Sequence, residues 1–142
     1  MNKNRSRFVW LITFSLMVAS CSVFGALQVD ELDGTKWDLL FIRKSAPISN
    51  RNITIQFGDG QVRGSSGCNT YFGEYQLKGS DISFGQLAST EMACMDPGGI
   101  MEQEQDYLSF LSEVVAYSVE SDQLILKKAV RDQLTFIRVL EE

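Results

Sequence analysis

Apolar and polar residues alternate along most of this chain, and that alternation limits the fold more than any other feature of the sequence. Successive side chains of a β-strand point to opposite faces, so each alternating run predicts a strand that is buried on one face. The residues predicted to face inward are Trp37, Leu39 and Phe41; Ile53, Ile55 and Phe57; Tyr71, Gly73, Tyr75 and Leu77; Ile82 and Phe84; Tyr117 and Val119; Leu124 and Leu126; and Leu134 and Phe136.

Turn signals separate these runs. Residues 58–60 read Gly-Asp-Gly, a favourable hairpin turn because Asp-Gly tolerates positive φ. Residues 78–81, 120–123 and 131–133 carry similar polar turn residues. Strands separated by turns every ten residues or so predict an antiparallel meander that curls into a barrel or sandwich.

One segment departs from the period of two. After Pro97 and two glycines, apolar residues recur at roughly helical spacing, at Met101, Leu108, Leu111 and Val115, and Glu102, Glu104 and Asp106 come early in the segment. Acidic residues near a helix N-terminus favour the helix dipole. We predict an amphipathic helix over about residues 100–112, with its apolar face closing one end or side of the sheet. The predicted class is therefore mainly β (α+β): an antiparallel meander curled into a small barrel-like sheet with one packed helix.

The first twenty residues are typical of an export signal. Lys3, Arg5 and Arg7 precede the uncharged apolar run 8–18, which is shorter than the roughly 20 residues of a spanning helix. The following "VASC" resembles the lipobox of bacterial lipoproteins, in which the cysteine, here Cys21, becomes a lipid-bearing N-terminus. The alternative is an ordinary signal cut after Gly25. We expect a signal peptide at 1–20, a tether at 21–32 and a domain at 33–140.

The charge of the exported part limits its partners. Without residues 1–20 the chain keeps ten basic and 18 acidic residues, a net charge of −8. Such a surface repels phosphate backbones, so we expect no nucleic-acid partner. We expect membrane contact through lipid on Cys21, which is stable when two acyl chains are attached. The expected location is the cell envelope, facing the periplasm and anchored at the outer membrane.

The chain contains no histidine, the usual general base for a serine or cysteine nucleophile and the commonest metal ligand. A catalytic Cys68 would need another base or a strongly depressed pKa. The glycines before Cys68 lead into a predicted strand and lack the Gly-Lys-Ser/Thr ending of a phosphate loop. We therefore predict no catalytic residues, no metal site and no cofactor, and keep a thiol enzyme or hydrolase using Cys68 as an alternative.

Three cysteines are an odd number for an exported protein. If Cys21 carries lipid, Cys68 and Cys94 remain as an even pair in a compartment that permits disulfides. A bond between them is favoured, and two buried thiols are the alternative, because free cysteine packs as a small apolar residue.

Two motifs together resemble the META domain, also called the HslJ-like family. The first is "GSSGCNTYFGEY", with Gly67, Cys68, Asn69, Tyr71, Gly73 and Tyr75; the second is "TEMAC", with Thr90, Met92, Ala93 and Cys94. The resemblance covers about residues 33–139, starting at "GTKWDL". It implies a small antiparallel barrel with one helix, an exported or lipid-anchored envelope protein, and a link to envelope stress through a heat-inducible member. It brings no agreed enzymatic activity.

We therefore expect a non-enzymatic domain that binds a protein or an apolar ligand in envelope maintenance or stress. A pilot or chaperone for another envelope protein is a further alternative.

Overall fold

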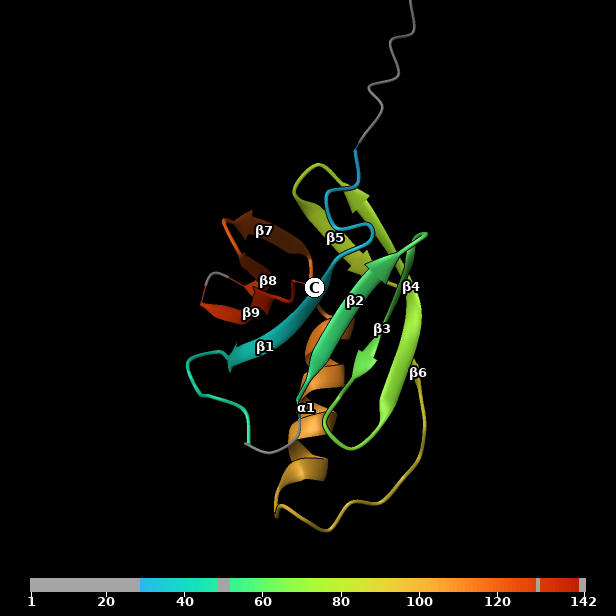
Figure 1. Cartoon of the computed structure of the whole chain (residues 1–142), viewed down its shortest axis with the longest axis vertical. Coiled ribbons are helices and arrows are strands. Elements are labelled where there is room, and N and C mark those ends of the chain that lie inside the picture. The colour runs from blue at the N-terminus through green and yellow to red at the C-terminus, as the bar shows by residue number, and fades with distance from the viewer. Residues whose placement is uncertain (1–28, 49–51, 130, 141–142) are drawn as a thin grey trace, which may run out of the picture.

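The computed structural model describes residues 29–48, 52–129 and 131–140. In these ranges the chain forms nine strands and one helix (Figure 1). In chain order they are β1 (Lys36–Ile42), β2 (Thr54–Gly58), β3 (Gln61–Ser65), β4 (Thr70–Lys78), β5 (Asp81–Phe84), β6 (Ala88–Ser89), α1 (Ile100–Ser112), β7 (Ala116–Glu120), β8 (Gln123–Ala129) and β9 (Asp132–Arg138).

Eight strands close into an antiparallel barrel. Their order is β3-β2-β1-β9-β8-β7-β5-β4, and β4 pairs back with β3 to complete the ring. The ninth strand, β6, pairs with the first part of β4, while β5 pairs with its last part. The predicted class, a mainly β barrel-like sheet with one packed helix, is confirmed. Strand β6 was not predicted, because its two residues are too short to show an alternation.

The predicted inward-facing side chains fill the barrel, with one exception. Trp37, Phe57, Tyr71 and Phe136 are fully buried or nearly so, and they belong to one continuous apolar cluster. Apolar burial is the main favourable contribution to folding, and a closed barrel of this size is filled by its own side chains.

Phe41 is the exception, and its predicted inward position is wrong. A β-bulge shifts the register of β1 against β9 between Leu39 and Phe41. Since a bulge inserts one extra residue, the side chains after it point to the opposite face. Phe41 is therefore 43% exposed, and the next residue, Ile42, packs against the core instead.

The helix closes one end of the barrel (Figure 1). The predicted bounds, about 100–112, match α1. Tyr107, Phe110 and Leu111 join the core cluster. The Phe110 ring lies under the cations of Arg43, just after β1, and Lys128, in β8, at 5.8 and 5.5 Å from the ring centre. The capped end is thus the one where β1 and β8 finish.

The apolar stripe predicted for this helix is partly wrong. Val115 lies beyond the helix end and is 58% exposed, while Met101 and Leu108 are half-buried. The buried positions are Ile100, Glu104, Tyr107, Phe110 and Leu111. The carboxylate in this set is considered below.

The segment before β1 packs over the opposite end of the barrel. Leu32 is fully buried in the core, and the Asp30 carboxylate accepts the hydroxyl of Tyr75 and the backbone N–H of Leu32. Asp33 accepts the backbone N–H of Asp59 in the β2–β3 turn, at 2.7 Å. The packed part of the chain therefore begins about three residues before the expected start at 33.

The predicted signal peptide, Cys21 and most of the tether lie outside the described residues. Across residues 29–48, 52–129 and 131–140, no helix combines the length and the apolar character needed to cross a membrane.

Candidate functional site

The Gly-Cys-Asn motif forms the tight connection between β3 and β4. The backbone N–H of Ser66 donates to the carbonyl of Asn69 at 2.8 Å and closes the turn. Gly67 has φ +113°, a backbone conformation that favours glycine. A Cβ at Gly67 would also lie 3.0 Å from Cδ1 of Ile100, so the helix start rests directly on this turn.

The turn is bound to the helix by the buried carboxylate of Glu104. Ser66 donates its hydroxyl to Oε2 at 2.6 Å, and Asn69 donates its backbone N–H to the same oxygen at 2.7 Å. The Asn69 carboxamide donates to Oε1 at 2.6 Å. Burial acts to raise the pKa of Glu104, but these hydrogen bonds outweigh it and hold the pKa below its ordinary value.

Glu104 was predicted only as one of three acidic residues near the helix N-terminus, and the structure buries its side chain. Glu104 is 6% exposed. A signal was available in the sequence: Ile100, Glu104, Tyr107 and Leu111 recur at helical spacing, so a single acidic residue falls on an otherwise apolar face. A lone carboxylate on a buried face needs several donors, and the Gly-Cys-Asn turn supplies them.

Asn69 also binds the second motif. Its Oδ1 accepts the hydroxyl of Thr90 and the backbone N–H of Met92, both at 2.7 Å, and its Nδ2 donates to the Met92 carbonyl at 3.1 Å. The φ of Asn69 is not positive, so its role in the turn is hydrogen bonding and not an unusual backbone angle. One carboxamide thus joins the two motifs and the helix.

A disulfide joins Cys68 to Cys94 across the same cluster. The bond that the cysteine count favoured is therefore present in the structure. The backbone N–H of Cys94 points to Sδ of Met101 at 3.4 Å. A thiolate is the form of cysteine that acts as a nucleophile, and a disulfide leaves no such group at Cys68.

The remaining motif residues extend the contacts along β4. The hydroxyl of Tyr71 donates to the carbonyl of Thr54 at 3.0 Å and lies 2.8 Å from the hydroxyl of Tyr107. Burial raises the pKa of Tyr71, and the neighbouring Tyr107 raises it further. A Cβ at Gly73 would lie 2.7 Å from Cδ2 of Leu87, so the side chain of Leu87 packs directly against this glycine.

A solvent-facing groove lies on the outer surface of the sheet, over β2, β3 and β4. Side chains there follow the strand register: Gln56 pairs with Arg63, Arg63 with Phe72, and Phe72 with Ala88. Phe72 is 61% exposed, a large value for an aromatic residue within a strand. It was not predicted as a site residue. The alternation in this strand predicts that residue 72 points outward. A large aromatic side chain at an outward position is the sequence signal that could have identified it as a site residue.

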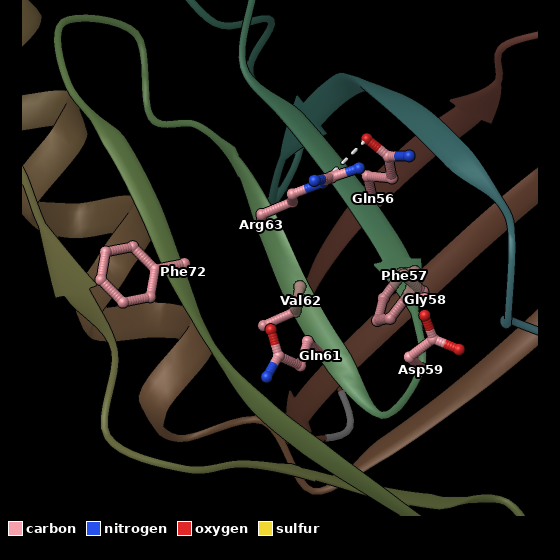
Figure 2. A pocket seen from close by; sticks show the side chains of 8 residues that line it. All are labelled: Gln56, Phe57, Gly58, Asp59, Gln61, Val62, Arg63 and Phe72. Atoms are coloured by element: carbon pink, nitrogen blue, oxygen red, sulfur yellow. Dashed lines mark hydrogen bonds between the residues drawn. The ribbon is translucent and has the colours of Figure 1, made fainter.

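Two hollows meet at Phe72. The first, shown in Figure 2, has a volume of about 280 Å³ and is lined by Gln56, Phe57, Gly58, Asp59, Gln61, Val62, Arg63 and Phe72. The second, of about 360 Å³, is lined by Gln61, Phe72, Gly73, Glu74, Gly85 and Gln86. Since both hollows share Gln61 and Phe72, we refer to them together as the Phe72 groove. In Figure 2, Arg63 donates a hydrogen bond to Gln56 above the first hollow, at 3.3 Å.

Among the side chains that the structure describes, no three His, Cys, Asp or Glu residues are placed to hold a metal ion.

The fold and the motif cluster define a class of small closed β-barrel, capped by one helix and braced by a disulfide. The chain belongs to the META domain family, whose model matches residues 30–140. No curated protein matches the chain.

Solved structures that are similar to this chain include the following three. An NMR structure of a protein from Burkholderia xenovorans shares 34% identity over 78% of this chain and 85% of its own, with a TM-score of 0.64. A second NMR structure shares 24% identity over 75% of this chain and 90% of its own, at a TM-score of 0.61. A crystal structure of a DUF4847 family protein from Bacteroides vulgatus shares 13% identity over 79% of this chain and 97% of its own, with a TM-score of 0.57. The last two show likeness of fold.

Proposed function

We propose that this protein is a lipid-anchored envelope protein whose META domain is a binding module and not an enzyme. The observation that carries the proposal is how the polar side chains of the family motif are used. Cys68 is held in a disulfide, and both polar atoms of the Asn69 carboxamide are occupied by Glu104, Thr90 and Met92. Groups that are fully bonded inside the fold stabilise it and are not free to act on a substrate.

Binding takes place on the outside of the barrel. The interior is filled by large, fully buried side chains, among them Trp37, Phe57, Tyr107 and Phe136. Protein interiors of this kind pack as densely as organic crystals and leave no room for a ligand. The two ligand types expected from the sequence, a protein and an apolar molecule, would therefore both have to bind on the outer surface. The Phe72 groove is the surface we assign to binding.

The envelope location rests on two independent supports. The "VASC" pattern provides Cys21 at the right distance from the apolar run. The bond between Cys68 and Cys94 suits an oxidising compartment such as the periplasm. Metabolic labelling with palmitate tests the anchor: the wild type takes up label and Cys21→Ala does not. Equal labelling of both proteins, or of neither, rejects it.

The binding role is tested by a photo-crosslinking amino acid at position 72, incorporated in cells, with position 41 as the control. Both positions carry an exposed phenylalanine on a strand, but Phe41 lies on β1, away from the groove. A recurrent adduct from position 72 alone supports the proposal. The same adducts from both positions, or none, argue against it. A single envelope protein as the recurrent adduct would favour the pilot or chaperone alternative.

The thiol-enzyme alternative predicts a free, alkylatable Cys68. The disulfide counts against it. Mass spectrometry after alkylation of the native protein, with and without reductant, decides the matter: labelling of Cys68 without reductant would restore the alternative.

A further inference from the structure

Two glycines in the Phe72 groove have no structural requirement to be glycine. A Cβ added at Gly58 would meet no atom within 4 Å, and one added at Gly85 would meet Glu74 no closer than 3.6 Å. Neither has a positive φ. Gly58 lines the first hollow and Gly85 lines the second. A side chain at either position would fill the hollow without backbone strain, so the absence of side chains keeps both hollows open.

The groove is built for hydrogen bonding around one aromatic ring. Its first hollow presents the carboxamides of Gln56 and Gln61, the guanidinium of Arg63 and the carboxylate of Asp59. Its second presents Gln61 again, with Glu74 and Gln86. Carboxamide, carboxylate and guanidinium groups are planar and can make paired hydrogen bonds. Phe72 stands between the two sets and offers an apolar surface.

The arrangement does not suit an added peptide strand. Peptides that extend a sheet need a free strand edge with unpaired N–H and C=O groups. Here β3 is paired with β2 on one edge and with β4 on the other, and β4 is paired with β5 and β6 beyond. A ligand that lies over β3 and β4 must therefore be recognised by side chains, and the outer edge of β6, which pairs with no other described strand, is only two residues long. A polyanion is disfavoured too, because the lining carries Asp59 and Glu74 against one cation, Arg63.

We propose that the Phe72 groove binds a linear, uncharged saccharide chain, an inference that rests on the binding role proposed above. Sugar rings carry an apolar C–H face, which packs on an aromatic ring, and neighbouring hydroxyls or acetamido groups, which pair with planar polar side chains. Two hollows on either side of Phe72 accommodate successive sugar units of one chain. Gly58 and Gly85 provide the space for those units.

Co-sedimentation of the full chain, in detergent, with insoluble chitin and cellulose tests the proposal, with soluble chitohexaose and maltohexaose as competitors. Phe72→Ala, Gly58→Leu and Gly85→Leu are each expected to weaken binding about tenfold or more, which is about 1.4 kcal/mol. Phe41→Ala and Gly98→Leu are the matched controls. Gly98 has an open Cβ position and no positive φ, but it lies outside the groove. Circular dichroism establishes that each variant is folded.

Retention by chitin or cellulose that is lost in the three groove variants and kept in both controls supports the proposal. No retention by either polymer overturns it, as does equal loss in groove and control variants. If no saccharide binds while position 72 crosslinks to a protein, the saccharide inference is wrong and the binding role stands. If position 72 also gives no specific adduct, both fail.

Discussion

Glu104 is the residue at which the helix and the Gly-Cys-Asn turn depend on each other most directly. Its carboxylate accepts three hydrogen bonds in the structure, from the hydroxyl of Ser66 and from the backbone and side chain of Asn69. The residue is 6% exposed, so water does not replace these bonds when they are lost. Each hydrogen bond to a charged group contributes about 1.5–3 kcal/mol, and a buried donor left alone adds a desolvation penalty.

Glu104→Ala removes the acceptor of the Asn69 backbone N–H and of one carboxamide N–H, and leaves the Ser66 hydroxyl only the Asn69 carbonyl at 2.9 Å. Removing one partner from a buried charged network typically costs about 3–5 kcal/mol, and we expect a loss of unfolding free energy in this range. Glu104→Gln keeps the shape but turns one acceptor into a donor, so its expected loss is smaller, about 1–3 kcal/mol. The second variant matters because a domain with a total stability of about 5–15 kcal/mol can be close to unfolding after the first.

Urea unfolding followed by tryptophan fluorescence measures both losses, because Trp37 is fully buried in the barrel. Glu102→Ala is the control: it removes an exposed carboxylate from the first turn of the same helix, and we expect a change within about 0.5 kcal/mol. If Glu104→Ala costs no more than this control, the argument for a turn held by its carboxylate is refuted.

The pH dependence provides a separate check on the charge. The folded-state pKa of Glu104 is below its ordinary value of 4.5. The stabilisation from its carboxylate is therefore present above about pH 4.5 and is lost as the pH falls through the folded-state pKa. The difference in stability between the wild type and Glu104→Gln should narrow as the solution is made more acidic than pH 4.5. A constant difference at all pH values would mean that charge is not the cause.

Three further outcomes follow from the geometry. Replacing both Cys68 and Cys94 by alanine opens a loop of 26 residues and should cost about 3–4 kcal/mol in urea unfolding; a loss below about 1 kcal/mol would contradict the pairing. Gly64→Ala should lower the unfolding free energy by about 1–3 kcal/mol or more, because its Cβ would collide with the Thr54 carbonyl oxygen; a melting temperature equal to wild type would contradict this close packing. Burial is the largest cause, and the nearby carboxylates of Glu31 and Asp30 add to it, in raising the pKa of Tyr117 from 10.0 to about 12. The unfolding free energy should therefore fall as the pH rises from about 10 to about 12, because the folded state holds the proton more tightly than the unfolded state. Unfolding measured across this pH range should show a smaller fall for Tyr117→Phe, and an unchanged fall would contradict the assignment to Tyr117.

The barrel could be predicted from the sequence because its strands follow a simple rule. Alternation identified the buried side chains of the closed sheet, and turn residues located the hairpins. Phe41 was misplaced because a β-bulge depends on how β1 pairs with β9, and β9 lies about 95 residues further along the chain. A register shift of this kind is a property of two distant strands and leaves no mark on either one alone.

The motif cluster was predictable in its members but not in its bonds. The cysteine count favoured the pair Cys68–Cys94, which the structure contains. The role of Asn69 could not be predicted from the sequence. Asn is common in turns because it tolerates unusual backbone angles, but here its side chain forms the hydrogen bonds that matter. Glu104 lies 35 residues from Asn69, and the contact exists because the capping helix crosses the end where β4 starts.

These contacts give the family motif a structural role that does not depend on catalysis. The connection from β6 to α1, residues 90–99, has no strand or helix of its own, so its position depends on side-chain bonds. Asn69 fixes its first part through Thr90 and Met92, and the disulfide fixes its middle at Cys94. Gln86, just before β6, lines the second hollow of the Phe72 groove, and Ala88 in β6 pairs with Phe72 itself. A motif that holds this connection in place therefore also sets the shape of the surface to which we assign binding, and substitutions at Asn69 should alter ligand binding at Phe72 without touching the ligand.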